Sequence, residues 1–396
     1  MPVPSRLKPA IPTTVWALGF VSLFMDLSSE LVHSLLPVFL VTTLGASALT
    51  LGLIEGVAEA TAMIVKVFSG AISDFFGRRK GLILLGYGLA AITKPLFPLA
   101  HSADMVFAAR FFDRIGKGIR GAPRDALIAD VAPAEIRGAC YGLRQTMDTA
   151  GAFLGPSLAI LLLFLYNSDI RVVMWFAVLP ALIAVLLIIT GIKEPEATQG
   201  PRLSPSHTRL AALRGFPRRY WWVVGVGCLF SLARFSEAFL VLRAQQLGLT
   251  VLWLPLVLLT MSLVYSLAAY PAGVVSDRMD RSSVLGIGLV VLIIADLVLA
   301  FADSILMTMF GVALWGLHMG LTQGILAAMI ADVTPTQLKG TAFGIFNFAS
   351  GVFLLLASVL AGWLWDQYGA EFTFVAGSLF AVGTLIWLRL IPSSVE

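Results

Sequence analysis

Long apolar runs separated by short polar segments dominate the chain. The first run spans about residues 15–40, and eleven more follow near residues 50–76, 81–100, 105–130, 138–166, 170–192, 221–247, 250–276, 283–302, 305–331, 338–365 and 371–391. Because a helix needs about 20 mostly apolar residues to cross a bilayer, each run predicts one transmembrane helix. We therefore expect an all-α membrane protein with twelve transmembrane helices.

The composition supports this class and excludes others. Hydrophobic residues make up 58% of the chain and charged residues 13%, with a mean hydropathy of +0.91, whereas soluble domains are about 45–50% apolar and about 25% charged. The helices leave little room for a soluble catalytic domain, which needs at least about 50 residues. The two cysteines, Cys140 and Cys228, lie in apolar runs and support neither a disulfide framework nor a metal site.

The distribution of basic residues predicts the orientation. With the N-terminus inside, Lys and Arg gather in the connections on that side of the membrane, and Arg171 alone lies in the opposite connections. Short loops rich in Lys and Arg stay in the cytoplasm. We therefore expect both termini in the cytoplasm. The same bias explains the net charge of +4 without a nucleic-acid partner.

A polar stretch divides the chain into halves. Residues 193–219 are rich in Pro, Arg and Ser and form the longest connection. Such composition is typical of a linker. We predict a six-helix bundle over residues 1–192, a cytoplasmic linker over 193–219 and a second six-helix bundle over 220–396.

The two halves repeat one another. ALIADVAPAEIRGACYG at residues 126–142 recurs as AMIADVTPTQLKGTAFG at 328–344, with eight of seventeen positions identical at an offset of 202. GAISDFFGRRK (70–80) likewise matches GVVSDRMDRSS (273–283). An even number of helices in each half places both copies the same way up. This predicts parallel repeats about an axis normal to the membrane.

The loop after the second predicted helix carries a family resemblance. The loop signature of the major facilitator superfamily resembles the pattern formed by Gly70, Asp74, Gly77, Arg78 and Arg79. The resemblance implies two bundles that rock and expose a central cavity alternately to each side, with helices 1, 4, 7 and 10 lining that cavity. The second copy has Asp280 and Ser282 at two signature positions, so we do not expect a fully symmetric cytoplasmic gate.

Two further features follow from the resemblance. Gly151, Gly155 and Pro156 resemble the family's exporter signature, although small residues at this spacing are also typical of close helix packing. Charges near the loop predict a cytoplasmic gate that pairs in one state and releases in the other, and a static surface ion cluster is the alternative. The predicted gate residues are Asp74, Arg78, Arg79, Arg120, Arg124, Asp130 and Asp277.

Ionisable residues inside the membrane helices gather in the first half. Such residues usually face protein or water and indicate function. By helical periodicity, three sets each share one face: Asp26, Glu30 and His33; Glu55, Glu59 and Lys66; and Arg110, Asp113, Arg114, Lys117, Arg120 and Arg124. When Lys94, Arg144 and Asp148 are added and Arg124 is left out, positive and negative charges nearly cancel, so a self-neutralising structural network is the alternative.

The functional interpretation gives these charges two roles. Asp26, Glu30 and Glu59 are predicted proton-coupling residues, because neighbouring carboxylates repel one another and this favours uptake of a proton near neutral pH. Guanidinium and ammonium groups bind carboxylates or phosphates. The predicted solute-binding residues are Arg110, Arg114 and Lys117 on helix 4, with Glu237 and Gln323 on helices 7 and 10.

We therefore predict a secondary active transporter of the bacterial inner membrane that works by alternating access. It exports a small organic solute with an anionic or amphipathic group in exchange for protons, as a monomer and without a cofactor. One alternative is transport of a divalent metal or metal chelate, with Asp26, Glu30 and His33 as metal ligands. Another is an intramembrane lipid-processing enzyme, but the chain has no HExxH, GxSxG or P-loop motif.

Overall fold

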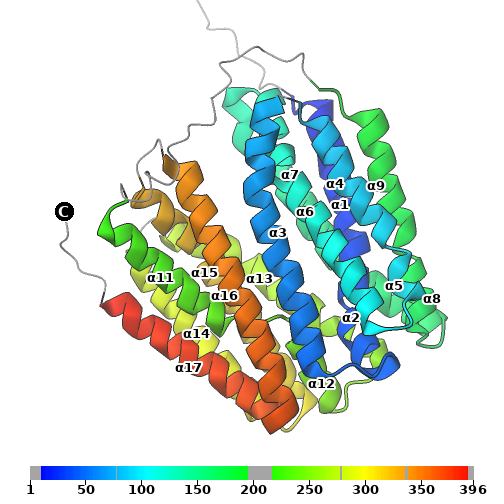
Figure 1. Ribbon diagram of the computed structural model, residues 1–396, viewed down its shortest axis with the longest axis vertical. Helices are drawn as coiled ribbons and strands as arrows, with labels where there is room; N and C mark the ends of the chain where they lie inside the picture. Colours follow the sequence, from blue (N-terminus) through cyan, green and yellow to red (C-terminus); the bar gives the residue numbers. More distant parts are fainter. Residues whose placement is uncertain (1–9, 77, 195–215, 277–278, 335–337, 391–396) are drawn as a thin grey trace, which may run out of the picture.

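The computed structural model describes residues 10–76, 78–194, 216–276, 279–334 and 338–390. All regular secondary structure in these ranges is helical. The helices form two bundles, the first containing α1 to α9 and the second α11 to α17 (Figure 1). The prediction of an all-α protein with two helical bundles is confirmed.

The first bundle contains six spans, several of them divided into segments. In chain order they are α1 (Thr13–His33) with α2 (Leu36–Val38) and the π-helical η1 (Phe39–Thr43); α3 (Ala48–Phe76); α4 (Lys80–Thr93) with α5 (Leu96–Leu99); α6 (Ala103–Val131); the 3-10 turn η2 (Ala134–Ile136) with α7 (Arg137–Leu165); and α8 (Ile170–Trp175) with α9 (Val178–Gly191).

The second bundle repeats this plan. Its spans are α11 (Arg218–Ala233) with α12 (Ala238–Gln246); the 3-10 turn η4 (Val251–Trp253) with α13 (Pro255–Ser276); α14 (Arg281–Ala300); α15 (Ile305–Asp332); α16 (Lys339–Tyr368); and α17 (Ala370–Arg389). Most of the linker predicted over residues 193–219 lies outside the described residues.

Eleven of the twelve spans in the described ranges are apolar enough to cross a membrane on composition alone. The twelfth, α6, has 29 residues and interrupts its apolar sequence with charged side chains. At about 1.5 Å per residue, α6 extends about 43 Å, which exceeds the roughly 30 Å hydrocarbon core of a bilayer. α6 is therefore long enough to span, and its polarity sets it apart from the other spans.

Two spans are interrupted at related positions. Ser34 and Leu35 separate α1 from α2, and the segment 234–237 separates α11 from α12. Ser34 and Ser236 are 202 residues apart, which is the offset of the sequence repeat. Interrupted helices leave backbone polar groups unpaired at membrane depth, where they face a cavity or buried protein. The two breaks therefore mark the centre of the molecule as the place to look for a site.

The two bundles are joined at the end opposite to that where α1 begins and α17 ends (Figure 1). There the backbone N–H groups of Ala48 and Leu49 in α3 donate to Asp366 Oδ1 and Oδ2 in α16, at 3.0 and 2.9 Å. Gly362 allows this approach, because a Cβ atom there would lie 2.4 Å from the Ala48 carbonyl oxygen. The short segments α2 and α12 also pack together across the bundles. We call this the joined end and the opposite one the termini end.

The apolar core follows the same division. One cluster of buried side chains includes residues of both bundles, such as Phe39 of η1 and Phe239 of α12. A second cluster, with Val15, Ile83 and Leu127 among its members, belongs to the first bundle alone and lies toward the termini end. Burial of apolar side chains therefore connects the bundles on the joined side.

Candidate functional site

Close helix packing brings the charges of α6 to those of α3 and α4. A Cβ atom on Gly116 would lie 2.5 Å from the Gly86 carbonyl oxygen of α4, and one on Gly118 would lie 2.6 Å from the Val65 side chain of α3. Only glycine permits these approaches. The polar face of α6 therefore meets polar residues of its neighbours inside the first bundle.

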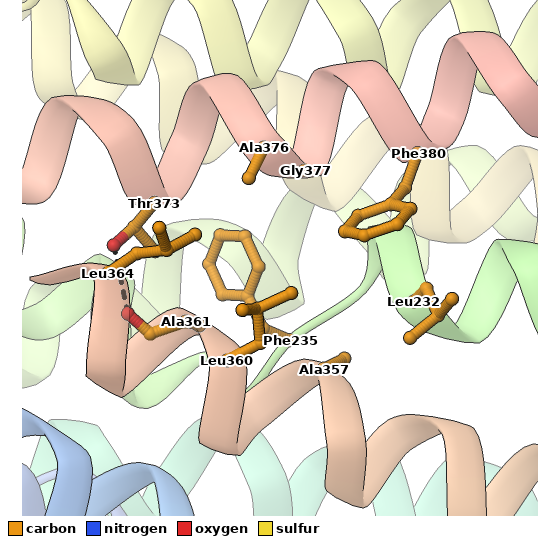
Figure 2. A pocket seen from close by; sticks show the side chains of 10 residues that line it. All are labelled: Leu232, Phe235, Ala357, Leu360, Ala361, Leu364, Thr373, Ala376, Gly377 and Phe380. Atoms are coloured by element: carbon orange, nitrogen blue, oxygen red, sulfur yellow. Dashed lines mark hydrogen bonds between the residues drawn. The ribbon is translucent and has the colours of Figure 1, made fainter.

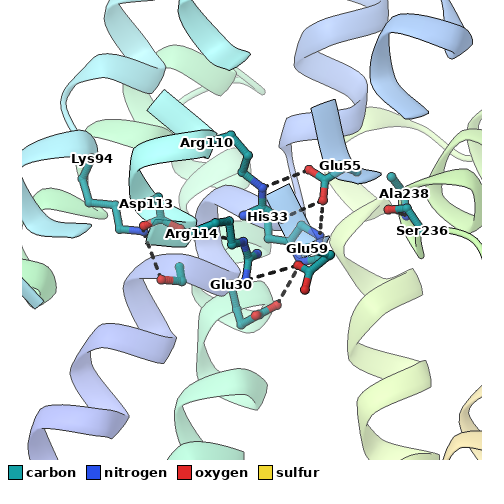
Figure 3. A network of polar contacts seen from close by, with 11 residues as sticks. Glu30, His33, Glu55, Glu59, Lys94, Arg110, Asp113, Arg114, Ser236 and Ala238 are labelled. Atoms are coloured by element: carbon teal, nitrogen blue, oxygen red, sulfur yellow. Dashed lines mark hydrogen bonds and ion pairs between the residues drawn. The ribbon is translucent and has the colours of Figure 1, made fainter. Parts of the chain in front are cut away.

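Glu55 of α3 is the centre of one group of contacts (Figure 3). The Arg110 guanidinium donates to it twice, with Nε at 3.1 Å from Oε1 and a terminal nitrogen at 2.7 Å from Oε2. His33, at the end of α1, lies between Glu55 and Glu30, with ring nitrogens 3.7 and 3.4 Å from their carboxylates. The bidentate contact between Arg110 and Glu55 is the strong form of an Arg–carboxylate pair.

Lys94 and Asp113 form a second group in the same network (Figure 3). The Lys94 ammonium lies 2.9 Å from Asp113 Oδ1 and 3.0 Å from the Ser29 hydroxyl. Arg114 lies 3.3 Å from the Glu59 carboxylate and 4.0 Å from that of Asp113. Buried charges need such partners, because an unpaired ion loses its hydration without compensation. The structure thus brings Glu30, Glu59 and Arg114 of the predicted cluster into one group of contacts in the first bundle.

The network has a buried side and an accessible side. The side chains of Glu55 and Asp113 are 1% and 5% exposed, whereas those of Glu30 and Glu59 are 28% and 32% exposed. Lys117 is exposed and has no ion-pair partner among the described residues. Asp26 is half-buried and likewise makes no ion pair or hydrogen bond with the described part of the chain. Glu30, Glu59, Asp26 and Lys117 therefore form the accessible side of the network.

A third group lies nearer the termini end. Arg124 donates to the Ser22 hydroxyl at 2.9 Å and lies 3.7 Å from Asp148, which Arg144 approaches to 2.7 Å. The Arg120 guanidinium stacks over the Tyr87 ring, 4.5 Å from its centroid. Asp125 also contacts Arg124 and Arg144, at 3.3 and 3.7 Å. Arg120 and Arg124, predicted as gate residues, are therefore engaged inside the bundle with these partners.

The loop charges form equivalent ion pairs in both bundles. Arg79 pairs with Asp130 and donates to the Ser73 hydroxyl at 3.2 Å. Arg281 pairs with Asp332, and both members lie 202 residues beyond their counterparts. The ion pair thus recurs although the second copy departs from the loop signature. Sequence reasoning missed Arg281 and Asp332, and applying the repeat offset to Arg79 and Asp130 would have found them.

Only some of the other predicted gate and solute-binding residues lie among the described residues. Arg78 is exposed. Asp277 lies outside the described residues, as do the side chains of Asp74 and Gln323. The predicted contact of Asp74 with Arg120 or Arg124 therefore stays a prediction.

The interrupted span of the second bundle faces the network. Arg234 lies 4.0 Å from Glu237, and both belong to the break between α11 and α12. Charges of the first bundle act on this pair, since His33 and Glu59 interact electrostatically with Glu237. The two helix breaks thus bring ionisable groups of both bundles to a common centre.

One buried acid of the second bundle was missed by sequence reasoning. Asp296 of α14 is fully buried, and neither carboxylate oxygen has a hydrogen-bond partner among the described residues. His318 of α15, also fully buried, has no partner for either ring nitrogen within the same ranges. The signal for Asp296 was present, because it is the single charged residue in the apolar run 283–301.

Two further features of the sequence were the possible metal ligands and the glycines that resemble an exporter signature. No group of three or more His, Cys, Asp and Glu side chains is placed to hold a metal ion in the described part of the chain. Gly151 and Gly155 of α7 lie against α1, where a Cβ atom would come within 2.5 Å of the Leu23 carbonyl oxygen and 2.8 Å of Glu30 Cβ. Close packing therefore explains the two glycines without an exporter signature.

The fold and the site together define a class of protein. Two six-helix bundles related by sequence repetition, with interrupted helices and partly accessible charges at their centre, are typical of membrane carriers that move a solute between the bundles. The chain belongs to the Major Facilitator Superfamily, whose family model matches residues 18–260 and 238–396. Membership of this family indicates a transporter, and the apolar helices of the described ranges fit a multi-pass membrane fold.

Similar proteins agree with this assignment. The chain is 33% identical over 380 residues to the MFS-type transporter MJ1317 of Methanocaldococcus jannaschii, covering 93% of this chain and 92% of the relative. It is 25% identical over 182 residues to the quinolone resistance protein NorA of Staphylococcus aureus, covering 46% of each. The nucleoside transporter NupG superposes with a TM-score of 0.80 over 96% of this chain and 99% of its own, at 13% identity, which shows the shared fold.

Proposed function

We propose that this protein is a proton-coupled exporter of a small organic solute with an anionic or amphipathic group. One observation carries the proposal. The accessible carboxylates Glu30 and Glu59 and the unpaired Asp26 lie in one charge network with Lys117 and Arg114. Acids that bind protons and cations that bind anions therefore share the same small region.

The two ligands compete in this arrangement. When Glu59 is ionised it holds Arg114, at 3.3 Å. A proton on Glu59 removes that attraction and frees the guanidinium for a carboxylate or phosphate of the solute. Lys117 adds a second cation beside it. Binding of a proton and exchange of solute are thereby linked, which is the requirement for coupled transport.

The orientation follows from the basic residues. We assign the termini end to the cytoplasm of a bacterial inner membrane, where the exposed Arg78, Arg218 and Arg219 lie. The conformation described here, joined at the opposite end, is then closed to the outside. The ion pairs Arg79–Asp130 and Arg281–Asp332 lie at the cytoplasmic face and act there as gate contacts within each bundle. Export is favoured by the similarity to a protein named for quinolone resistance.

The first experiment identifies the solute. Purified protein is screened by thermal shift against drugs, organic acids, divalent metals and metal chelates, and a bound solute raises the unfolding temperature. A stabilising drug or organic acid supports the proposal. Stabilisation by metals or chelates alone contradicts it and favours the metal-transport alternative.

The second experiment tests coupling with the solute found. In proteoliposomes with a pH gradient, wild-type protein accumulates the solute against its concentration gradient. We expect Glu30→Gln and Glu59→Gln to lose this accumulation, because neither retains an ionisable group at that position. Asp303→Asn, which removes an exposed carboxylate from the loop after α14, is the matched control. Full gradient-driven accumulation in both glutamine variants contradicts the assignment.

A further inference from the structure

Asp296 occupies a position whose counterpart in the first bundle carries the opposite charge. Equivalent contacts and helix caps in the two bundles confirm the offset of 202 at positions before and after Asp296. Gly86 packs against Arg120 and Gly288 against Thr322. The caps Ser102 and Ser304 begin α6 and α15 in the same way, with each side chain accepting a backbone N–H three residues on. Subtracting 202 from Asp296 gives Lys94.

The contacts of Lys94 show what Asp296 lacks. Lys94 bonds to Asp113 and to Ser29. The residues at the equivalent positions of the second bundle are Trp315 and Ser231. The Trp315 indole N–H has no partner among the described residues, and the Ser231 hydroxyl donates to the Gly227 carbonyl oxygen instead. An ion pair in one bundle is thus replaced in the other by an acid that has no counter-ion among the described residues.

No charged side chain described on the neighbouring helices compensates for the missing cation. α14 packs against α13, α15 and α17. Their titratable or charged side chains in the described ranges are Tyr265, His318, Asp332, Glu371 and Arg389, and none makes an ion pair or hydrogen bond with Asp296. A bare carboxylate buried in this way would be very costly, and the carboxyl group avoids that cost by holding a proton. Burial without a described partner therefore favours the neutral form of the Asp296 carboxyl group in this conformation.

The neighbours of Asp296 connect it to the moving parts. A Cβ atom on Gly377 would lie 2.8 Å from Asp296 Oδ2 and 3.0 Å from the Phe235 ring, so glycine leaves the room that the carboxyl group occupies. Phe235 lies in the break before α12, and its ring also lies 5.3 Å from that of Trp315. Phe235 and Gly377 both line a small apolar recess between α11, α16 and α17 (Figure 2).

Separation of the bundles at the joined end would disturb this packing. α12 packs against α2 of the first bundle at that end, and Phe235 lies three residues before α12 begins. Asp296 lies four residues before Ala300, where α14 ends, or about 6 Å along the helix axis. A shift of α12 and Phe235 would therefore open the short route from the outer solution to the carboxyl group.

We propose that Asp296 is a proton-binding site of the second bundle, loaded from the outer side, and that the joined end closes only when the proton is bound. The carboxylate takes up one proton from the outer solution and becomes a neutral carboxylic acid, which is then buried behind Phe235. Low outer pH favours this closed conformation, because the conformation that binds the proton more tightly gains population as the pH falls. The inference needs neither a particular solute nor the acids of the first bundle.

Two measurements on the purified protein test the site. Infrared difference spectroscopy between wild type and Asp296→Asn should show a protonated carboxyl band that the variant lacks at neutral pH. Spin labels at Thr43 and Gln367, which are exposed at the joined end of the first and second bundles, report closure in a background with Cys140 and Cys228 replaced by Ala. The closed fraction of wild type should fall as the pH rises from mildly acidic to mildly alkaline.

The variants separate this site from other proton sites. Asp296→Asn keeps the shape of the neutral acid, so the closed fraction should stay high over the whole pH range. Gly377→Ala should lower the closed fraction at every pH by crowding the carboxyl group, whereas Gly383→Ala on the same helix, where a Cβ atom meets nothing within 4 Å, should match wild type. An unchanged carboxyl band in Asp296→Asn, or closure in that variant with the pH response of wild type, overturns the proposal. Neither result depends on solute transport, so the proposed function is tested separately.

Discussion

On α6 of the first bundle, one face carries Arg110 and Lys117, and the same positions of α15 in the second bundle carry Val312 and Met319. The helices themselves are nearly the same length and begin with the same serine cap. The backbone plan of a bundle therefore does not require interior charges. Because apolar side chains occupy the equivalent positions of α15, the charges of α6 are not needed for folding alone. Their presence in one bundle indicates a role beyond stability.

The second bundle has polar features of its own at the membrane face and at the helix break, besides the buried Asp296. The Arg281–Asp332 pair repeats the Arg79–Asp130 pair at the membrane face, and the break before α12 repeats the break before α2. The loop ion pairs and the helix breaks thus recur in both copies, whereas the cationic face of α6 does not.

Breaking the central pair of the first bundle should have the largest effect. Arg110→Met leaves Glu55, whose side chain is 1% exposed, with His33 at 3.7 Å as its remaining partner. Removing one member of a buried ion pair typically costs about 3–5 kcal/mol. We expect a loss of that size in the free energy of unfolding in detergent micelles. The double variant Glu55→Leu with Arg110→Met should recover most of it, and a loss in the double variant equal to the sum of the two single-variant losses would show that the two charges are not coupled.

The same substitution at equivalent positions should act in opposite directions in the two bundles. Lys94→Leu leaves Asp113 with Arg114 at 4.0 Å and should lower the free energy of unfolding by about 3 kcal/mol. Asp296→Leu removes a carboxyl group that has no partner among the described residues, so we expect no loss, or a gain of about 1 kcal/mol. Thermal unfolding of the two variants measures the contrast. Comparable destabilisation by both would mean that Asp296 has a compensating partner.

The number of spans and the charged faces could be predicted from the sequence. Each span must cover the bilayer and satisfy its own backbone hydrogen bonds, which makes apolar runs easy to recognise. Helical periodicity then places Glu55 and Glu59 on one face of α3. Which cation each acid meets could not be predicted, because Arg110 reaches Glu55 only at the helix separation that Gly118 permits.

The unpaired groups were harder to predict than the paired ones. Asp296 has no counterpart of like charge in the first bundle, so a search for similar charges in both repeats passes over it. The contact of Asp366 with the start of α3 joins residues 318 and 317 positions apart in the two bundles, and no local pattern indicates it. Such contacts depend on the conformation in which the bundles meet, which the sequence does not specify.

The contact of Asp366 at the joined end allows a test of how strongly the two bundles are held together. Asp366→Ala removes the acceptor of two N–H groups at the start of α3. Loss of a helix N-terminal acceptor costs about 1 kcal/mol, so the ratio of closed to open molecules should fall by roughly fivefold. The spin labels at Thr43 and Gln367 measure this ratio. Asp303→Ala, which removes an exposed carboxylate elsewhere on that side, should leave it unchanged.

The smallest effects should come from the two loop ion pairs, where the bundles are most alike. Arg281 and Asp332 are 36% and 56% exposed, and pairs of this kind contribute about 1 kcal/mol or less. Arg281→Ala should therefore lower the free energy of unfolding by less than about 1 kcal/mol. Arg79→Ala should cost somewhat more, because Arg79 is 18% exposed and also donates to Ser73.

Chemical denaturation at low and high salt measures both variants. Added salt should shrink the effect of Arg281→Ala more than that of Arg79→Ala, since screening acts mainly on exposed charges. If Arg281→Ala instead proves as costly as a substitution among the buried charges of the first bundle, the loop ion pairs would contribute as much to stability as those buried charges do. A small, salt-sensitive loss of stability for both variants would mean that the two loop pairs contribute similarly to the free energy of unfolding. The bundles would then differ energetically in their interiors, where the charges of α6 have no counterpart in α15.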